Sequence, residues 1–127
     1  MANVDIVNKM YQGLATGDIP GALNTMDPEI EWIEAEGFPY AGTYRGPQAV
    51  LDGVFARLGG EWEGFAAVPE LIVSDGGQVV ARGWYSGTYK ATGRSFKARF
   101  VHWFEVAGDR IVRFEQLTDT VKVREAL

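Results

Sequence analysis

Two alternating segments near the end of the chain, residues 95–107 and 110–120, constrain the fold most strongly. In the first segment, apolar side chains and one histidine occupy every second position: Phe96, Ala98, Phe100, His102 and Phe104. Strand side chains alternate between faces, so these residues would share one face. In the second segment, charged and apolar residues fall on the same side: Ile111, Arg113, Glu115, Leu117 and Asp119. We expect two strands joined at Gly108-Asp109, with either a bulge in the second strand or carboxylates on a packing face that lines a pocket.

Length and composition favour a single domain over residues 1–127. With 46% hydrophobic and 13% aromatic residues, a chain of 127 residues can build a sizeable core. Seventeen acidic residues against 12 basic ones give a net charge of −5, which argues against nucleic acid as a partner. The chain has no cysteine, which fits a reducing compartment.

Several classes of site and location are disfavoured by what the sequence lacks. No signal segment opens the chain, and its apolar runs are shorter than the ~20 residues of a membrane helix, so we expect a soluble cytoplasmic protein. A single histidine rules out a multi-histidine metal site. The glycine pairs lack phosphate-loop spacing, and we expect no metal and no cofactor.

The first half of the chain predicts three helices. Residues 3–16 show helical spacing with Asn3 as a plausible N-cap, and Asp18 can cap a second, shorter helix. A third helix begins at Gly46-Pro47 and ends at Gly59-Gly60.

Strand patterns occur in residues 29–36, before the third helix, and in residues 62–74 and 78–90, after it. In residues 78–90 the small residues Gly83 and Gly87 predict a curved strand or the close approach of another element. Residues 37–45 form an aromatic loop that we expect to line or cover something. Helices first and antiparallel hairpins afterwards predict an α+β domain.

This order of elements resembles the nuclear transport factor 2 fold over nearly the whole chain. The runs GTYRGPQAV and GDRIVRFEQLTDT are similar to those of its SnoaL-like, ketosteroid-isomerase-related group. The resemblance implies a cone-shaped half-barrel, in which a strongly curved antiparallel sheet carries the three helices on its concave face around a small-molecule pocket. It also implies a homodimer formed through the convex face of the sheet.

The resemblance further suggests catalytic residues. In SnoaL-like polyketide cyclases, an aspartate near the end of the last strand acts as acid and base, with a histidine on the preceding strand nearby. Asp119 and His102 stand at these places, and Glu115 lies on the same side as Asp119. The alternatives are a core histidine with one hydrogen bond, a strand-end turn residue and a surface ion pair, respectively. The catalytic residues of ketosteroid isomerases cannot be matched one by one.

Aromatic residues elsewhere are candidates for the walls of the pocket. Trp32 and Glu34 share a strand face, and Glu34 would be a polar handle or second base. The remaining candidates for substrate binding are Phe38, Tyr40, Tyr85 and Phe100. All of these aromatic residues are also compatible with plain core. Trp84 and Trp103 fall on the opposite sheet face, which a partner subunit would cover.

The sequence therefore predicts a pocket for a small apolar or ring-containing organic molecule, in a cofactor-free isomerase or cyclase. Asp119 would remove a proton next to a carbonyl, His102 would orient it, and Tyr40 or Tyr85 would steady the enolate oxygen. One alternative is a non-catalytic ligand-binding or dimeric assembly module. Another is an epoxide hydrolase-like enzyme, although the Asp-Arg-Asp relay of that activity lacks a convincing arginine.

Overall fold

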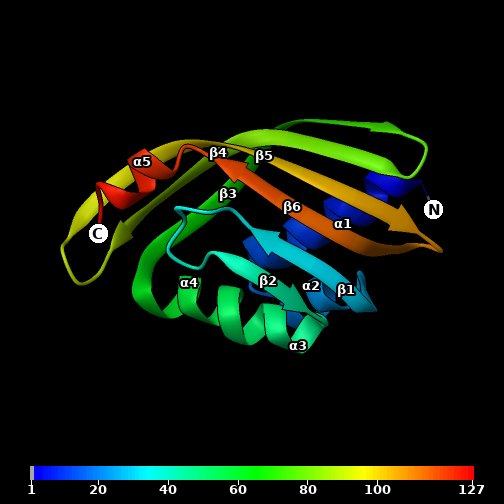
Figure 1. The fold of residues 1–127 in the computed structure, drawn as a ribbon, viewed down its shortest axis with the longest axis horizontal. Helices are drawn as coiled ribbons and strands as arrows, with labels where there is room; N and C mark the ends of the chain where they lie inside the picture. Colours follow the sequence, from blue (N-terminus) through cyan, green and yellow to red (C-terminus); the bar gives the residue numbers. More distant parts are fainter. Residues whose placement is uncertain (1) are drawn as a thin grey trace.

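A curved six-stranded sheet in the order β2-β1-β6-β5-β4-β3 organises the computed structural model, which describes residues 2–127 (Figure 1). The strands are β1 (Met26–Glu34), β2 (Gly42–Arg45), β3 (Trp62–Asp75), β4 (Gln78–Tyr89), β5 (Arg94–Ala107) and β6 (Arg110–Thr118). Neighbouring strands are antiparallel except for β1 and β6, which run parallel. The sheet does not close, so the α+β class and the cone-shaped half-barrel are confirmed.

The helices are α1 (Asn3–Thr16), α2 (Ile19–Leu23), α3 (Pro47–Val50), η1 (Leu51–Phe55), α4 (Ala56–Glu61) and α5 (Thr120–Arg124). α3, η1 and α4 follow one another without a break, and η1 is a π-helical turn. Asp18 caps α2 as expected. The N-cap of α1 is Ala2 and not Asn3, whose side-chain amide donates to the Gly76 carbonyl at 2.9 Å. α5 was not expected. No helix within residues 2–127 is long and apolar enough to span a membrane.

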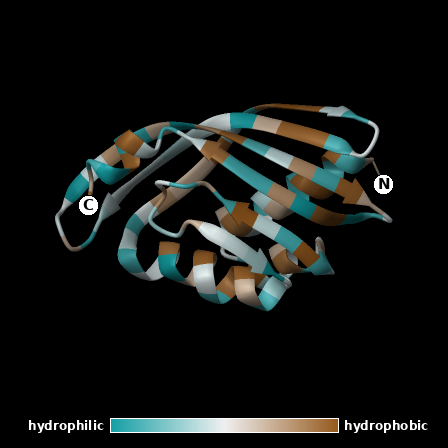
Figure 2. Ribbon diagram, in the orientation of Figure 1, coloured by the Kyte–Doolittle hydropathy of each residue, from teal (hydrophilic) through white to brown (hydrophobic). Residues whose placement is uncertain are grey.

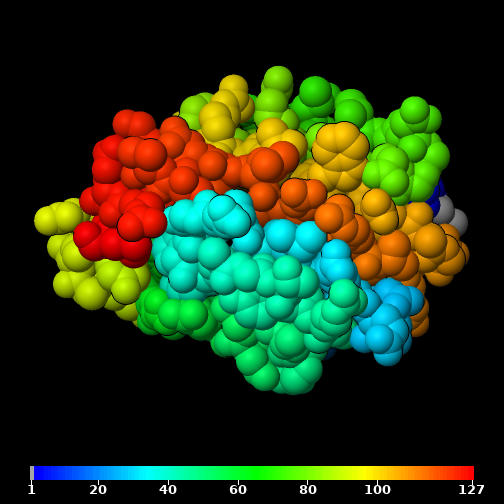
Figure 3. Space-filling model, viewed as in Figure 1, coloured from blue at the N-terminus to red at the C-terminus, as the bar shows by residue number. Residues whose placement is uncertain are grey.

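The long helix α1 packs against the concave face of the sheet. Its buried residues include Ile6, Val7, Met10 and Tyr11, which recur at helical spacing. Hydrophobic and hydrophilic positions alternate along the central strands, so one side of the sheet faces this helix and the other faces outward (Figure 2). On the face seen in Figure 3, side chains of β1, β2, α3 and β6 form a continuous surface.

A bulge in the last hairpin decides which way β6 faces. Glu105 pairs with Arg113, but the next residue, Val106, pairs with Ile111, so β6 contains one extra residue. After this bulge Phe114 and Gln116 point inward and are buried. The bulge expected as one of two possibilities is therefore present, and the side of β6 that carries Glu115 is the outer face.

A close approach of β3 to β4 confirms the expectation drawn from the small residues of β4. A Cβ atom at Gly83 would overlap the Val68 carbonyl oxygen and lie 2.7 Å from the Phe100 ring. The register of β3 against β4 shifts next to this point, between Pro69 and Leu71. Only glycine fits here, and the irregularity bends the pair.

We predict that Gly83→Ala lowers the free energy of unfolding by about 1–3 kcal/mol, because backbone atoms of β3 must move. Gly60→Ala is the matched control, since nothing lies within 4 Å of its added Cβ and the residue sits in α4. Alanine favours the helical conformation more than glycine does, so the free energy of unfolding of this control should equal or exceed that of the wild type. Urea unfolding measures both variants, and equal stabilities would contradict the close approach at Gly83.

Candidate functional site

A cavity of about 450 Å³ lies between the concave face of the sheet and the helices. Most of its lining is apolar, from α1, η1, α4, β3 and β6, and its polar side chains are Tyr11, Glu34, Tyr85 and His102. This composition is typical of small-molecule sites. A second depression of about 590 Å³ lies between α1, α2 and the β5–β6 turn, but its titratable residues are exposed: Lys9, Asp18 and Asp109. The first cavity is therefore the stronger candidate.

His102 lies at the centre of the concave face and is hydrogen-bonded at both ring nitrogens. Its Nδ1 atom is 2.7 Å from the Tyr11 hydroxyl, and its Nε2 atom is 2.5 Å from the Tyr85 hydroxyl. The ring stacks on Phe100 at a centroid distance of 4.0 Å. Burial lowers the pKa of His102 to about 3, so the imidazole is neutral at physiological pH.

Gln116, a residue that the sequence patterns did not single out, extends this hydrogen-bonded group. Its Nε2 atom donates to the Tyr85 hydroxyl at 3.0 Å, and its Oε1 atom accepts from the Ala35 amide at 3.0 Å. Tyr11 was not singled out either, because it lies on the buried stripe of α1, where helical spacing alone does not distinguish it from a core residue. Once the bulge in β6 is located, the alternation of that strand puts Gln116 on its inner face.

Glu34 carries the least compensated polar atoms of the cavity. The side chain is 5% exposed, and neither its Oε2 atom nor the Trp32 indole nitrogen has a hydrogen-bond partner among the described residues. Burial raises the pKa of Glu34 to about 8, and the nearby Trp32 indole offsets part of this rise. The carboxyl group is therefore poised to gain or lose a proton near neutral pH.

Comparison with known proteins assigns this chain to a family. A model described as the SnoaL-like domain matches residues 7–114. Patulin synthesis protein F from Aspergillus clavatus is 34% identical over an alignment of 115 residues, and the match covers 87% of this chain and 56% of that protein. The chain belongs to the SnoaL-like family. It spans a little over half the length of this curated relative.

Solved structures agree with the SnoaL-like assignment. A nuclear transport factor 2-like protein from Burkholderia thailandensis is 40% identical with a TM-score of 0.96, and the match covers 99% of this chain and 97% of that one. TerC, co-crystallised with polyporic acid, is 27% identical with a TM-score of 0.88, covering 98% and 96%. The fold that the sequence resemblance implied is confirmed.

The structure of this SnoaL-like domain does not bring Asp119 or Glu115 to His102. Asp119 is exposed and caps α5, where its Oδ1 atom accepts from the Lys122 amide at 3.3 Å. Glu115 lies on the outer face of β6, 3.5 Å from Arg113. The prediction that these carboxylates share a cavity with His102 is therefore wrong, because the bulge turns their side of β6 outward and the chain leaves the strand before Asp119.

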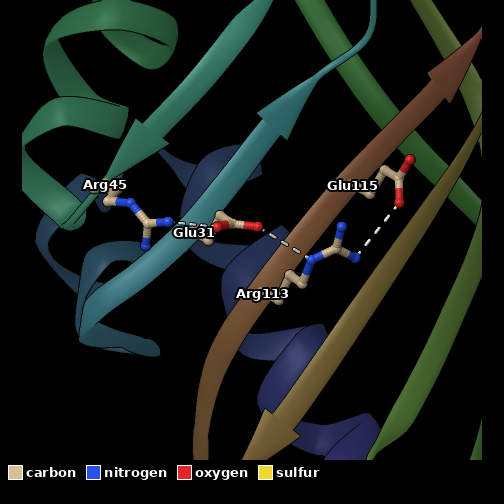
Figure 4. A network of polar contacts seen from close by, with 4 residues as sticks. All are labelled: Glu31, Arg45, Arg113 and Glu115. Carbon is tan, nitrogen blue, oxygen red and sulfur yellow. Dashed lines mark hydrogen bonds and ion pairs between the residues drawn. The ribbon is translucent and has the colours of Figure 1, made fainter.

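Glu115 belongs instead to a network on the outer face of the sheet (Figure 4). Glu31 on β1 contacts Arg45 of β2 at 2.7 Å and Arg113 of β6 at 3.3 Å, and Arg113 also contacts Glu115. These side chains are partly exposed, so each pair contributes little to stability. The network connects β1, β2 and β6 on the outer face of the sheet, opposite the inner face of β1 that carries Trp32 and Glu34.

The other predicted pocket residues divide into two groups. Trp32, Glu34 and Tyr85 line the cavity. Phe38, Tyr40 and Phe100 are buried around it without lining it. The Tyr40 hydroxyl donates to Glu61 at 2.8 Å and accepts from Trp62 at 2.9 Å, so its proton is already used. The prediction that Tyr40 steadies an enolate is therefore wrong, because its hydroxyl is hydrogen-bonded to residues at the junction of α4 and β3.

No arginine or lysine of residues 2–127 lines the cavity, so the Asp-Arg-Asp relay of an epoxide hydrolase-like enzyme has no counterpart there.

We predict a decline in stability between pH 6.5 and 8 that depends on Glu34. Since the pKa of Glu34 rises from 4.5 to about 8 on folding, the folded state holds a proton that the unfolded chain releases, and stability falls as pH rises through this range. His102, with its pKa lowered from 6.5 to about 3, changes stability only below pH 6.5 and with the opposite sign. The expected loss between pH 6.5 and 8 is roughly 1.5 kcal/mol.

Urea unfolding at each pH measures this effect. Glu34→Gln should abolish the loss, since an amide does not titrate. Glu115→Gln removes an exposed carboxyl and should keep the wild-type slope. Parallel pH curves for the wild type and Glu34→Gln would show that the Glu34 carboxyl is not protonated in the folded state.

Proposed function

We propose that this SnoaL-like domain binds a neutral, ring-containing carbonyl compound and moves a proton next to the carbonyl without a cofactor, as an isomerase or cyclase. The observation that carries this proposal is the buried Glu34 carboxyl, which has an oxygen without a hydrogen-bond partner and lines the same cavity as Tyr11 and His102. Glu34 takes the role of base that the sequence suggested for Asp119.

Glu34 has the acidity that proton transfer at neutral pH requires. With a pKa of about 8, roughly a tenth of the molecules carry the carboxylate at pH 7, and the protonated form is ready to return a proton. The carboxylate would take a proton from carbon next to the carbonyl; the C–H electron pair would form a C=C bond, and the C=O π pair would move onto oxygen as an enolate. Return of the proton from Glu34 to another carbon completes an isomerisation. Attack of the enolate carbon on a second carbonyl closes a ring, and the alkoxide that this forms takes the proton back from Glu34.

Tyr11 is the group best placed to stabilise the enolate oxygen. Tyr85 has two protein hydrogen-bond partners, His102 and Gln116, whereas Tyr11 has one, His102. A phenol can donate and accept at once, so Tyr11 retains hydrogen-bonding capacity toward the cavity that it lines. A donor fixed in place before the reaction stabilises developing negative charge without reorganising.

The lining of the cavity supports a neutral, oxygen-bearing ring compound. Its titratable residues are Tyr11, Glu34, Tyr85 and His102, so it offers no positive side chain to a carboxylate substrate. The aromatic wall includes Trp32 and Phe55, whose rings meet edge to face at 5.5 Å. The names of two relatives, one a patulin synthesis protein and one co-crystallised with polyporic acid, support a small oxygen-rich ligand.

Deuterium exchange tests the proton transfer without knowledge of the natural product. The protein is incubated in D₂O with a panel of cyclic ketones, enones and hydroxyquinones, and mass spectrometry measures deuterium at carbon next to the carbonyl. We expect catalysed exchange for at least one class of ring compound. Glu34→Gln should lower its rate ~10²-fold or more, since the amide cannot accept the proton.

Two control variants separate the base from other carboxylates. Asp119→Asn and Glu115→Gln alter exposed or outward-facing groups and should retain the exchange rate. Binding of a ring compound without exchange would favour the non-catalytic ligand-binding module. Exchange that survives Glu34→Gln would remove Glu34 as the base.

We also propose that two copies pair through the outer face of the sheet. Large apolar side chains are exposed there: Val68, Leu71, Val73, Trp103 and Leu117. Trp103 is 44% exposed, and Trp84 on the same face is covered only in part, by Lys97 and Arg99. Exposed apolar surface of this kind is typical of protein interfaces.

Sedimentation velocity at tens of micromolar tests this pairing. We expect a dimer that buries on the order of 800 Å² per partner, and Trp103→Asp should shift it toward monomer by placing a charge in the contact. Val121→Asp is the control, because Val121 is 64% exposed on α5 and lies outside this face. A monomeric wild type would contradict the proposal.

A further inference from the structure

A row of buried polar groups crosses the concave side of the sheet and ends at the cavity. It runs from the Ala35 amide, just after β1, through Gln116 of β6, Tyr85 of β4 and His102 of β5 to Tyr11 of α1. Gln116 is 1% exposed and His102 4%, so these groups are shielded from bulk water. Each proton in the row, except at the Tyr11 end that meets the cavity, is therefore expected to find its partner inside the row.

The Ala35 amide fixes the orientation of Gln116. A backbone N–H can only donate, so the side-chain atom facing it at 3.0 Å must be the Gln116 carbonyl oxygen. The amide nitrogen of Gln116 then faces the Tyr85 hydroxyl and donates to it at 3.0 Å. Rotating the amide by half a turn would place two donors against each other at Ala35.

The orientation of Gln116 determines where the Tyr85 proton goes. Gln116 presents a donor, so Tyr85 cannot donate to it, and the Oε2 atom of Glu34 accepts no hydrogen bond. The remaining partner is His102 Nε2, at 2.5 Å. If Nε2 carried a proton instead, the fully buried Tyr85 hydroxyl would have no acceptor for its own proton among the described residues.

His102 is therefore protonated on Nδ1. A neutral imidazole carries one proton, and with Nε2 accepting from Tyr85 that proton lies on Nδ1 and is donated to the Tyr11 oxygen at 2.7 Å. The Tyr11 hydroxyl proton is then not used by the protein. It remains available to an oxygen atom of a ligand in the cavity that Tyr11 lines.

We infer that Gln116 is a positioning residue: it presents to Tyr85 a donor and no acceptor, and so leaves His102 Nε2 as the one acceptor for the Tyr85 proton among the described residues. This arrangement holds His102 in the Nδ1–H tautomer and makes Tyr11 a hydrogen-bond donor to the cavity. This inference rests on the proposed function for the role of Tyr11 in catalysis, but the tautomer is a property of the ligand-free protein. In the opposite tautomer the Tyr11 hydroxyl would donate to Nδ1 of His102, and its proton would not be available to a ligand.

Nitrogen NMR of the ligand-free protein tests the inference. His102 is the single histidine of the chain, so ¹⁵N-histidine labelling and long-range ¹H–¹⁵N spectra at pH 7 show one imidazole. We expect Nδ1 to give the shift of a protonated nitrogen and Nε2 that of an unprotonated one. A neutral histidine side chain in water favours the opposite form. A proton on Nε2 in the wild type would overturn the inference.

Two substitutions at Gln116 separate its role in directing the proton from its role in packing. Gln116→Met fills similar space without an acceptor for the Tyr85 proton, so the Nδ1–H form should persist. Gln116→Glu introduces a group that, once ionised, accepts from Tyr85 and should move the histidine proton to Nε2.

The carbon-13 shift of the introduced carboxyl group reports its ionisation in the same sample. A protonated carboxyl with Nδ1–H, or an ionised carboxyl with Nε2–H, supports the inference. An ionised carboxyl with an unchanged Nδ1–H form, or a shift to Nε2–H in Gln116→Met, overturns it. Because neither measurement requires a ligand, failure of proton transfer at Glu34 would not affect the result.

Discussion

The buried hydrogen bonds to both nitrogens of His102 are the constraint on which the site depends. An imidazole with an exposed fraction of 4% can stay inside the fold only if it is neutral and its polar atoms are paired. Tyr11 of α1 and Tyr85 of β4 provide this pairing, so the histidine couples the helix to the sheet. Any packing that separated α1 from the concave face would leave these polar groups unpaired, which ties the cavity wall to the stability of the fold.

Alternation along the strands was enough to predict much of this arrangement. It grouped His102 with Phe100 on one face of β5, and Trp32 with Glu34 on one face of β1 whose direction the sequence left open; all four side chains are buried. The order of helices and strands predicted the α+β class, whereas the cone was implied by the family resemblance. The strand patterns and the order of elements depend on local periodicity, which a sequence displays directly.

The facing of β6 stayed open in the sequence, because its mixed alternation is compatible either with a bulge, which shifts the facing by one residue, or with carboxylates on an inner face. Glu115 and Asp119 were therefore assigned to the inner side, where Gln116 lies instead. The role of Tyr11 could not be predicted for another reason. A tyrosine at helical spacing is indistinguishable from a core residue in the sequence, and the histidine that its hydroxyl contacts lies 91 positions away.

Glu34 and His102 show how one apolar cavity can hold two titratable groups with opposite pKa shifts. Burial disfavours whichever form is charged, so it raises the pKa of the acid to about 8 and lowers that of the base to about 3. Both groups are mostly neutral at pH 7. In the function that we propose they have different roles: the carboxyl exchanges its proton with a ligand, while the imidazole keeps its proton and orients its neighbours. In the proposed reaction a neutral substrate adds no charge to the cavity, and the single negative charge of the reactive form moves from the Glu34 carboxylate to the substrate oxygen, where a fixed donor such as Tyr11 can stabilise it.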